Sequence, residues 1–328
     1  MPRLRVEHIR PFRPLQDIGE VADLLAVAFG DKLDPVSRIA LDEMRRIGRR
    51  TSLIHILHWI LGFRFYASPG YVWVEDGEIV GNVSLRRARS PDGFLIGNVA
   101  VHPKFRRRGI ATQLMRAALR EVEEQGGTWV GLEVETGNAP ARSLYEKLGF
   151  RAIGTVLHMV HPEGLVWKGK VGNSVPLRRG RTDDRDALVA LMRKTIPEDQ
   201  RPLMEVRKSD YEPTGGFLSR WIGRGDHWWV WEEEADILGA VRVRRRGWRR
   251  PNLLEVLVDP PCSGEVAPSL VRKGLASLPR RAKRMVEAQL PDPLTPVVRA
   301  LKEEGFEETR TLTQMRLDLS KAVSISVG

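Results

Sequence analysis

The chain has 328 residues, of which 42% are hydrophobic, so it is long enough for two domains that each bury a core. Its single cysteine, Cys262, excludes an internal disulfide and fits a reducing compartment. Lysine and arginine number 53 against 42 aspartates and glutamates, and the net charge of +11 favours acidic partners, nucleic acid and the ribosome among them. We expect a cytoplasmic protein, because the first residues lack the apolar segment of a signal peptide and the longest apolar run, 53–63, is too short to span a bilayer.

The first part of the chain predicts a strand, two helical regions and a hairpin. Alternating hydrophobic residues favour a strand over 4–12, and an amphipathic pattern favours a helix over 15–29. A second helical region follows over 35–63, and Gly48 could interrupt it. Strands over 71–75 and 79–87 flank Asp76-Gly77-Glu78, a sequence typical of a tight hairpin.

The most informative stretch begins at Phe94. Residues 94–101 are apolar and favour a strand, which His102-Pro103 ends because proline has no N–H for a sheet ladder. From about Arg108 the hydrophobic residues recur with the period of a helix. Between strand and helix lies Arg106-Arg-Arg-Gly109. Such a turn suits a phosphate, because the first N–H groups of a helix have no internal partner and the helix dipole adds positive charge.

A second motif follows a strand expected over 129–135. It reads Asn138-Ala-Pro-Ala-Arg-Ser-Leu-Tyr-Glu-Lys-Leu-Gly-Phe150, in which Asn138 is a good helix N-cap and Gly149 a good C-terminal stop. With these motifs in this order, residues 71–160 resemble the GNAT superfamily of N-acetyltransferases. In that family a Gln/Arg-x-x-Gly-x-Gly/Ala loop precedes a helix, and an Asn, a Tyr seven residues later and a Gly-Phe pair follow.

The resemblance implies acetyl-coenzyme A as the cosubstrate. The basic loop would bind its pyrophosphate, and the strand before the loop would splay from its neighbour and hydrogen-bond the pantetheine arm. The residues expected to bind it are Val99, Ala100, Val101, Arg106, Arg107, Arg108, Gly109, Ile110, Ala111, Thr112, Asn138 and Arg142. A solvated basic turn that caps a helix is the alternative interpretation of the loop.

The resemblance also implies catalytic residues. Tyr145 would give a proton to the leaving sulfur as general acid, and the alternative is a tyrosine packed at the edge of the apolar face of its helix. Glu133 lies five residues before Asn138, as does the glutamate that relays the amine proton through water in ribosomal-protein alanine N-terminal acetyltransferases. Its alternative is a solvent-facing carboxylate. Val101 and its neighbours could offer a backbone N–H to the thioester carbonyl.

The expected reaction is attack of a neutral primary amine on the acetyl thioester. An α-amine has a pKa of about 7.7–8.0 and a lysine one of about 10.4, so a lysine needs about 3.5 kcal/mol more for deprotonation. An α-amine of a protein or peptide, or a small amine of low pKa, is therefore the easier acceptor. The candidates to line the acceptor cleft are His55, His58, Trp59, Phe63 and Phe65, although core packing is the more common role of such residues.

The second half of the sequence resembles the first, shifted by about 157 residues. Residues 230–239 echo 72–81, and residues 254–260 echo 97–103. The fold predicted is α/β, with two tandem GNAT-like domains, each a mixed, mostly antiparallel splayed sheet flanked by helices. We expect an active domain over 1–161, a linker over 162–175, a degenerate domain over 176–320 and a tail over 321–328.

The second copy is expected not to bind acetyl-CoA. Its counterpart of the phosphate loop is 263–268, where Val266 stands at the position of Gly109 and its branched side chain restricts the approach of a phosphate. Of the catalytic pair, Tyr145 is matched by Leu301 and Glu133 by Gln289. One acetyl-CoA per chain is therefore predicted.

The remaining signals are weaker. No metal site is expected, because the histidine pairs 55/58 and 158/161 have no cysteine or acidic cluster at ligand spacing. The basic run 244–250 contains Trp248 and could touch RNA or an acidic protein, although a solvated hairpin tip is more common. Two other functions stay open, a CoA-binding scaffold without turnover and a basic RNA- or ribosome-associated protein on the same fold. A membrane partner is not expected.

Overall fold

The computed structural model describes residues 8–30, 33–49, 70–162, 176–211, 226–234, 236–245, 251–278 and 284–319. The chain divides into two compact units: unit 1 comprises residues 1–152 and 314–328, and unit 2 comprises 153–313. In the described ranges, no helix is long and apolar enough to cross a membrane. The same ranges hold no group of three or more His, Cys, Asp or Glu side chains placed to bind a metal ion.

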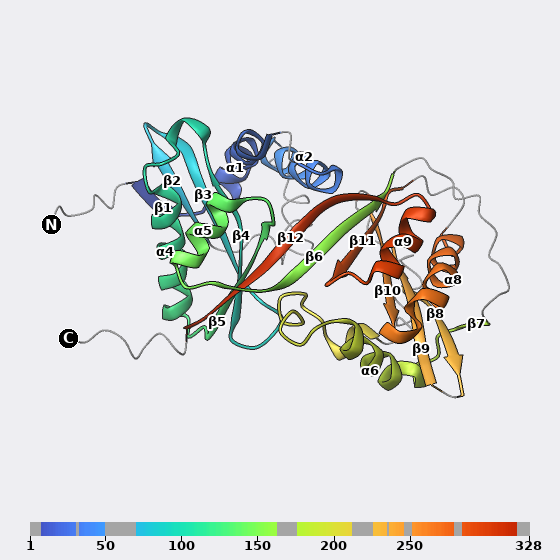
Figure 1. Ribbon diagram of the computed structural model, residues 1–328. Coiled ribbons are helices and arrows are strands. Elements are labelled where there is room, and N and C mark those ends of the chain that lie inside the picture. The colour runs from blue at the N-terminus through green and yellow to red at the C-terminus, as the bar shows by residue number, and fades with distance from the viewer. Residues whose placement is uncertain are drawn as a thin grey trace. The chain divides into compact units, whose positions relative to one another are not determined.

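Unit 1 contains a mixed sheet with helices on both faces. Its elements are β1 (Ile9–Pro11), α1 (Pro14–Phe29), α2 (Pro35–Arg49), β2 (Gly70–Glu75), β3 (Glu78–Arg87), β4 (Gly93–Val101), η3 (Pro103–Phe105), α4 (Ile110–Glu124), β5 (Trp129–Glu135), α5 (Ala139–Lys147) and the end of β12 (Glu307–Asp318). The strands follow the order β1-β2-β3-β4-β5-β12 (Figure 1). The pairs from β1 to β4 are antiparallel, and β4 pairs with β5 in parallel.

Two apolar clusters form the core of unit 1. On one face, α4 packs with Ile110, Leu114 and Met115 against β2, β3 and β4. On the other face, α1 contributes Val21 and Leu25. The helices and strands predicted here from hydrophobic periodicity are confirmed, because burial of one face repeats at 3.6 residues in a helix and at two in a strand.

The expected interruption at Gly48 is wrong, because α2 continues through it to Arg49. A Cβ at Gly48 would lie 2.9 Å from the Cα of Gly19 in α1. The absence of a side chain at Gly48 therefore permits the close approach of α1 and α2. Residues 4–7 of the predicted first strand lie outside the described residues, and so do residues 50–69, which include the aromatic and histidine candidates for the acceptor cleft.

Unit 2 repeats this plan. Its elements are β6 (Arg151–His161, within the unit from Ile153), β7 (Leu177–Arg179), η4 (Thr182–Asp184), α6 (Arg185–Thr195), η5 (Lys208–Tyr211), β8 (Asp226–Glu233), β9 (Asp236–Arg244), β10 (Asn252–Val258), η6 (Pro260–Cys262), α8 (Ser263–Ala276), β11 (Val286–Pro291), α9 (Thr295–Glu303) and the start of β12. The strand order is β7-β8-β9-β10-β11-β6, with β10 and β11 parallel. The predicted linker, 162–175, and tail, 321–328, lie outside the described residues except for Pro162.

Unit 1 is made of two separate segments of the sequence, unlike the continuous domain predicted over 1–161, and unit 2 is continuous but begins before the predicted start at 176. Strand β6 follows the first GNAT-like motif, yet from Ile153 onward it belongs to unit 2 and pairs with β11. Strand β12 follows the second motif, yet from Gln314 onward it belongs to unit 1. Unit 1 therefore contains the end of β12, from the second half of the sequence, and unit 2 contains most of β6, from the first half.

Candidate active site

The sheet of unit 1 opens between β4 and β5. The two strands pair in parallel from Gly93 opposite Trp129 to Ile96 opposite Leu132, and the pairing ends there. Both strands continue beyond this point, β4 as far as Val101. The strand before the basic loop is therefore splayed from its neighbour, as the sequence predicts.

A β-bulge bends β4 at this opening. Asn98 and Val99 together lie opposite Val83 of β3, because the register shifts between Asn82 and Ser84. Asn98 has a φ of 50°, which asparagine accepts more readily than most residues. The buried Asn82 donates from Nδ2 to Asn98 O at 2.8 Å, and Asn98 Nδ2 donates to Ser84 Oγ at 3.3 Å. Sequence analysis missed these residues, although asparagine inside a strand is an available signal because strands are depleted in it.

The backbone of β4 presents a donor to the opening. His102 N–H donates to Val80 O on β3 at 2.8 Å. Neighbouring N–H groups along an antiparallel strand point to opposite sides, so the N–H of Val101 points away from β3. Val99 and Val101 pack at the margin of the α4 core, whereas Ala100 is buried in the cluster beneath α1. Binding of the pantetheine arm by these three residues stays a prediction.

The loop before α4 has the backbone of an anion site. Arg107 and Gly109 have φ angles of 67° and 78°, and Gly109 is the N-cap of α4. The first bond of the helix runs from Gln113 N to Gly109 O, so the N–H groups of residues 110–112 have no carbonyl partner inside the helix. A Cβ at Gly109 would meet only Gln113 Nε2, at 4.0 Å, which leaves the space beside the loop open. Exposed N–H groups at a helix start in such a loop are suited to phosphate.

The three arginines of the loop have different surroundings. Arg106 donates from Nε to Val101 O at 3.2 Å and from Nη2 to a carbonyl at the end of α1 at 2.8 Å. Arg108 Nη1 lies 3.3 Å from Glu75 Oε1. The side chain of Arg107 is exposed and has no such partner among the described residues. Arg106 and Arg108 therefore hold the loop in place, and contacts of the three arginines with a phosphate stay predictions.

Helix α5 begins as the sequence predicts. Asn138 caps it, because its Oδ1 accepts from Ala141 N at 3.3 Å. Arg142 reaches back over the first turn, where Nη1 donates to Thr136 O at 3.4 Å, and its guanidinium lies 3.8 Å from Glu146. Both side chains serve the helix start in this structure, and their expected contacts with acetyl-CoA stay predictions.

Tyr145 lies in the core of unit 1. Its side chain is 6% exposed and belongs to the cluster that contains Leu132 and Val134 of β5. Its ring lies 6.1 Å from that of Phe150. Burial raises the pKa of the Tyr145 hydroxyl to about 12, so the group is protonated at neutral pH and can donate a hydrogen bond.

Glu133 lies on the other face of β5. Leu132 and Val134 point into the core beside α4, whereas the intervening Glu133 is exposed. Its Oε1 accepts a hydrogen bond from Gln314 Nε2 at 2.9 Å. Gln314 is fully buried on β12, the strand that unit 1 takes from the second half of the sequence, and sequence analysis missed it.

The structure thus brings most of the predicted site residues to the edges of one opening. The end of β4, the basic loop and the start of α4 form one edge, and the end of β5 leads to the other. Tyr145 and Glu133 do not come together, because they lie on opposite faces of β5. The Tyr145 ring thus lies on the core side of β5, and the Glu133 carboxylate lies on the exposed side.

Unit 2 lacks the loop. Helix α8 follows η6 directly, so residues 263–268 form the first turns of a helix. Val266, at the position of Gly109, is fully buried, and so is Leu301, at the position of Tyr145. Strand β10 pairs with β9 without a register shift, so the bulge of β4 has no counterpart.

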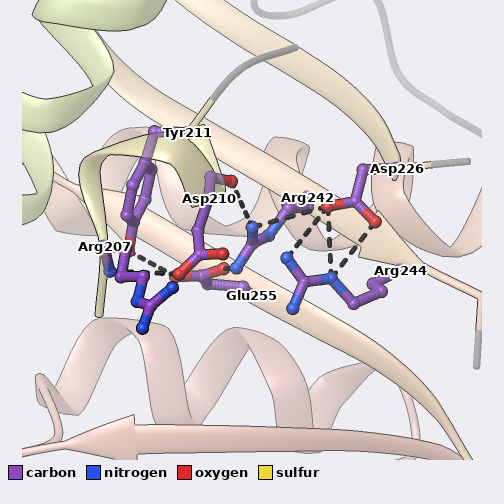
Figure 2. Close-up of polar contacts among 7 residues, drawn as sticks. All are labelled: Arg207, Asp210, Tyr211, Asp226, Arg242, Arg244 and Glu255. Carbon is purple, nitrogen blue, oxygen red and sulfur yellow. Dashed lines mark hydrogen bonds and ion pairs between the residues drawn. The ribbon is translucent and has the colours of Figure 1, made fainter. Parts of the chain in front are cut away.

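A buried charged cluster occupies the strand pair β9–β10 of unit 2 (Figure 2). Arg242 is 5% exposed and lies directly opposite Glu255 in the strand register. Its guanidinium pairs with Glu255 and, at 3.5 Å, with Asp226, and it also donates to Asp210 O. The hydroxyl of Tyr211 donates to Glu255 Oε1 at 3.0 Å. In unit 2, a packed ion-pair network therefore lies on β9 and β10, the strand pair that corresponds to β3–β4 of unit 1.

Comparison with known proteins agrees with the geometry of unit 1. Residues 33–150 match the model of the acetyltransferase (GNAT) family. The [ribosomal protein bS18]-alanine N-acetyltransferase of Salmonella typhimurium is 45% identical over 59 residues, which cover 18% of this chain and 40% of that enzyme. The chain spans between 30% and 62% of the length of the first curated relatives that it matches.

Two solved structures match nearly the whole chain. A GCN5-related N-acetyltransferase from Sphaerobacter thermophilus has a TM-score of 0.65 at 17% identity, with 95% of each chain covered. A tandem GNAT protein from the clavulanic acid biosynthesis pathway has a TM-score of 0.56 at 15% identity, with 94% of this chain and 98% of that chain covered. Residues 33–150 therefore match the GNAT family, and the chain as a whole has the fold of these two solved structures.

Proposed function

We propose that unit 1 is an acetyl-CoA-dependent N-acetyltransferase, that its acceptor is a primary amine, and that unit 2 does not bind acetyl-CoA. The observation that carries the proposal is the opening between β4 and β5, which lies beside the left-handed loop at the start of α4. A reducing compartment such as the cytoplasm suits a chain whose one cysteine, Cys262, is unpaired.

The chain's own groups fit acetyl-CoA as a substrate. The N–H groups of residues 110–112 and the side chain of Arg107 would bind its pyrophosphate. The inner edge of β4, at residues 99–101, would bind the pantetheine arm. The thioester would then lie in the opening, where the N–H of Val101 can donate a hydrogen bond to the carbonyl oxygen and stabilise the negative charge that develops there.

Gly109→Glu should lower the affinity for acetyl-CoA at least tenfold, which is about 1.4 kcal/mol. The change places bulk and negative charge where we expect the pyrophosphate, in space that is open in this structure. Gly109→Gln is the matched control, because it has the same strain of a side chain at positive φ but no charge. Calorimetric titration of both variants measures the effect, and circular dichroism confirms folding. If the folded Glu variant binds as the parent does, the assignment of the loop is wrong.

The reaction then needs two proton movements. The amine nitrogen attacks the acetyl carbon, and Glu133 takes a proton from the amine through water. The carbon–sulfur bond breaks, and Tyr145 donates a hydrogen bond to the departing thiolate. Full proton transfer from a hydroxyl of pKa about 12 to a thiolate whose conjugate acid has a pKa of about 8.5 is uphill by about 5 kcal/mol. Tyr145 therefore stabilises the departing thiolate by a hydrogen bond, and any proton that it gives up to sulfur must be replaced from water.

The acceptor that we favour is the α-amine of a peptide or protein. The similar Salmonella enzyme is named as an N-acetyltransferase of an alanine in ribosomal protein bS18. Glu133 is a carboxylate, and an α-amine needs about 3.5 kcal/mol less deprotonation than a lysine at neutral pH. A small amine of low pKa is also easily deprotonated, so small amines are the second group of acceptors to be tested.

The test is an acetyl-transfer screen that reads release of free thiol. Peptides with a free α-amine should react at least about tenfold faster than the same peptides with a blocked N-terminus and one lysine. Polyamines and aminoglycosides form the small-molecule arm. If no amine releases thiol although acetyl-CoA binds, the chain is a CoA-binding scaffold and the proposed enzyme activity is wrong.

A further inference from the structure

A pocket of about 180 Å³ lies on unit 2, between the edge strands β7 and β8 and the end of α8. The residues that line it are Arg179, His227, Trp229, Lys273, Ala276 and Ser277. None of them belongs to the candidate active site, and unit 2 lacks the phosphate loop. The pocket is therefore a separate feature of the half of the chain that has lost the acetyl-CoA motif.

Cationic side chains meet at one aromatic ring in this pocket. Arg179 lies opposite Trp229 in the register of β7 and β8, and its guanidinium lies 5.8 Å from the centroid of the Trp229 ring. The ammonium of Lys273, from α8, lies 3.9 Å from the same centroid. Arg179 Nη2 also lies 3.4 Å from His227 Nδ1. The ring holds both cations in place, because an aromatic face attracts positive charge without neutralising it.

No carboxylate balances these charges within the described part of the chain. Neither Arg179 nor Lys273 has an ion pair there, and Trp229 Nε1 is buried without an acceptor there. Asp226, which precedes His227 in the sequence, pairs instead with Arg242 and Arg244. Because neighbouring residues of a strand face opposite sides of the sheet, Asp226 lies on the side away from His227.

The pKa of His227 reflects the positive charges around it. Burial lowers the pKa of its imidazole, and the nearby cations Arg245 and Arg179 lower it further, while Asp226 opposes them. Arg245 also has a buried Nε without an acceptor among the described residues. A bound anion would reverse this effect, because negative charge favours the imidazolium form.

We propose that this pocket binds a phosphate group, held between Arg179 and Lys273 beside His227. Its size fits one phosphate with a small attached group. Two nitrogen cations and a ring nitrogen that converge on a site without acids form a donor set suited to phosphate. The phosphate can come from a free phosphorylated compound or from the backbone of RNA, since Arg245 belongs to the basic run 244–250.

The test follows His227 by NMR while the full-length chain is titrated with pyrophosphate. The signal is local, so phosphate bound at the loop of unit 1 does not contribute to it. The pKa of His227 should rise on saturation, and Arg179→Gln or Lys273→Met should weaken pyrophosphate binding at least tenfold. Lys208→Met is the matched control, because it removes one exposed positive charge from η5, outside the pocket, and it should bind as the parent does.

A second arm identifies the source of the phosphate. A fluorescent single-stranded RNA is titrated into the parent and the variants at several salt concentrations. RNA binding that pyrophosphate displaces, and that both pocket variants weaken, would assign the pocket to RNA, whereas pyrophosphate binding without RNA binding would assign it to a free phosphorylated compound. If pyrophosphate leaves the pKa of His227 unchanged, or if the variants bind it as the parent does, the proposal is wrong.

Discussion

Tyr145→Phe should lower kcat by on the order of 10²-fold and leave acetyl-CoA affinity nearly unchanged. The substitution keeps the ring that packs beside Phe150 and deletes only the hydroxyl. Without that hydroxyl the departing thiolate has no donor from α5, so the loss falls on the chemical step. Steady-state kinetics of thiol release, together with calorimetric titration of acetyl-CoA, separates the two quantities.

Tyr71→Phe is the matched control for this experiment. Tyr71 is a second tyrosine of unit 1 whose hydroxyl donates to Glu121 at 2.9 Å, away from the opening between β4 and β5. Its loss should leave kcat close to that of the parent. If Tyr145→Phe also turns over like the parent, Tyr145 is a packing residue and the proton reaches sulfur from water.

Arg242→Met should lower the free energy of unfolding of unit 2 by about 3–5 kcal/mol. Arg242 is 5% exposed and its partner Glu255 is 17% exposed, so removal of the cation leaves a poorly solvated carboxylate without its ion pair. Urea unfolding followed by tryptophan fluorescence measures the change, because the ring of Trp228 lies 5.0 Å from the guanidinium.

Two further variants test the origin of this loss. Arg242→Met combined with Glu255→Leu removes both charges, and it should recover much of the stability, because a buried ion pair and a well-packed apolar pair are often close in free energy. Lys302→Met removes a cation from an exposed pair with Glu308 and should change stability by no more than about 1 kcal/mol. A double variant that is less stable than Arg242→Met would contradict the account of the cluster.

The sequence predicts the local parts of the site well. The basic loop, the N-cap at Asn138 and the end of the second motif at Gly149 depend on residues close together in the chain. Their backbone preferences follow from side-chain chemistry, such as the positive φ that glycine accepts at position 109. The structure confirms these elements because no distant contact is needed to specify them.

The non-local parts could not be predicted in the same way. The exchange of β6 and β12 between the units depends on which strand pairs with which, and the residues of a strand do not by themselves specify its partner strand. For this reason motif analysis could not identify Gln314 as the hydrogen-bond partner of Glu133. Residues 263–268, which align with the phosphate loop of unit 1, form the start of helix α8 instead of a loop. The helix accommodates Pro268 in its interior.

The most direct test of the account is the number of acetyl-CoA molecules that the full-length chain binds. Calorimetric titration of the parent should give one site per chain, because within the described residues only unit 1 has a left-handed loop before its helix and a β-bulge on the strand that precedes the loop. The full-length chain is needed, because each unit takes its last strand from the other half of the sequence. Gly109→Glu should weaken that one site. Two sites of similar affinity in the parent, or full binding by the Gly109→Glu variant, would contradict the assignment of acetyl-CoA to unit 1 alone.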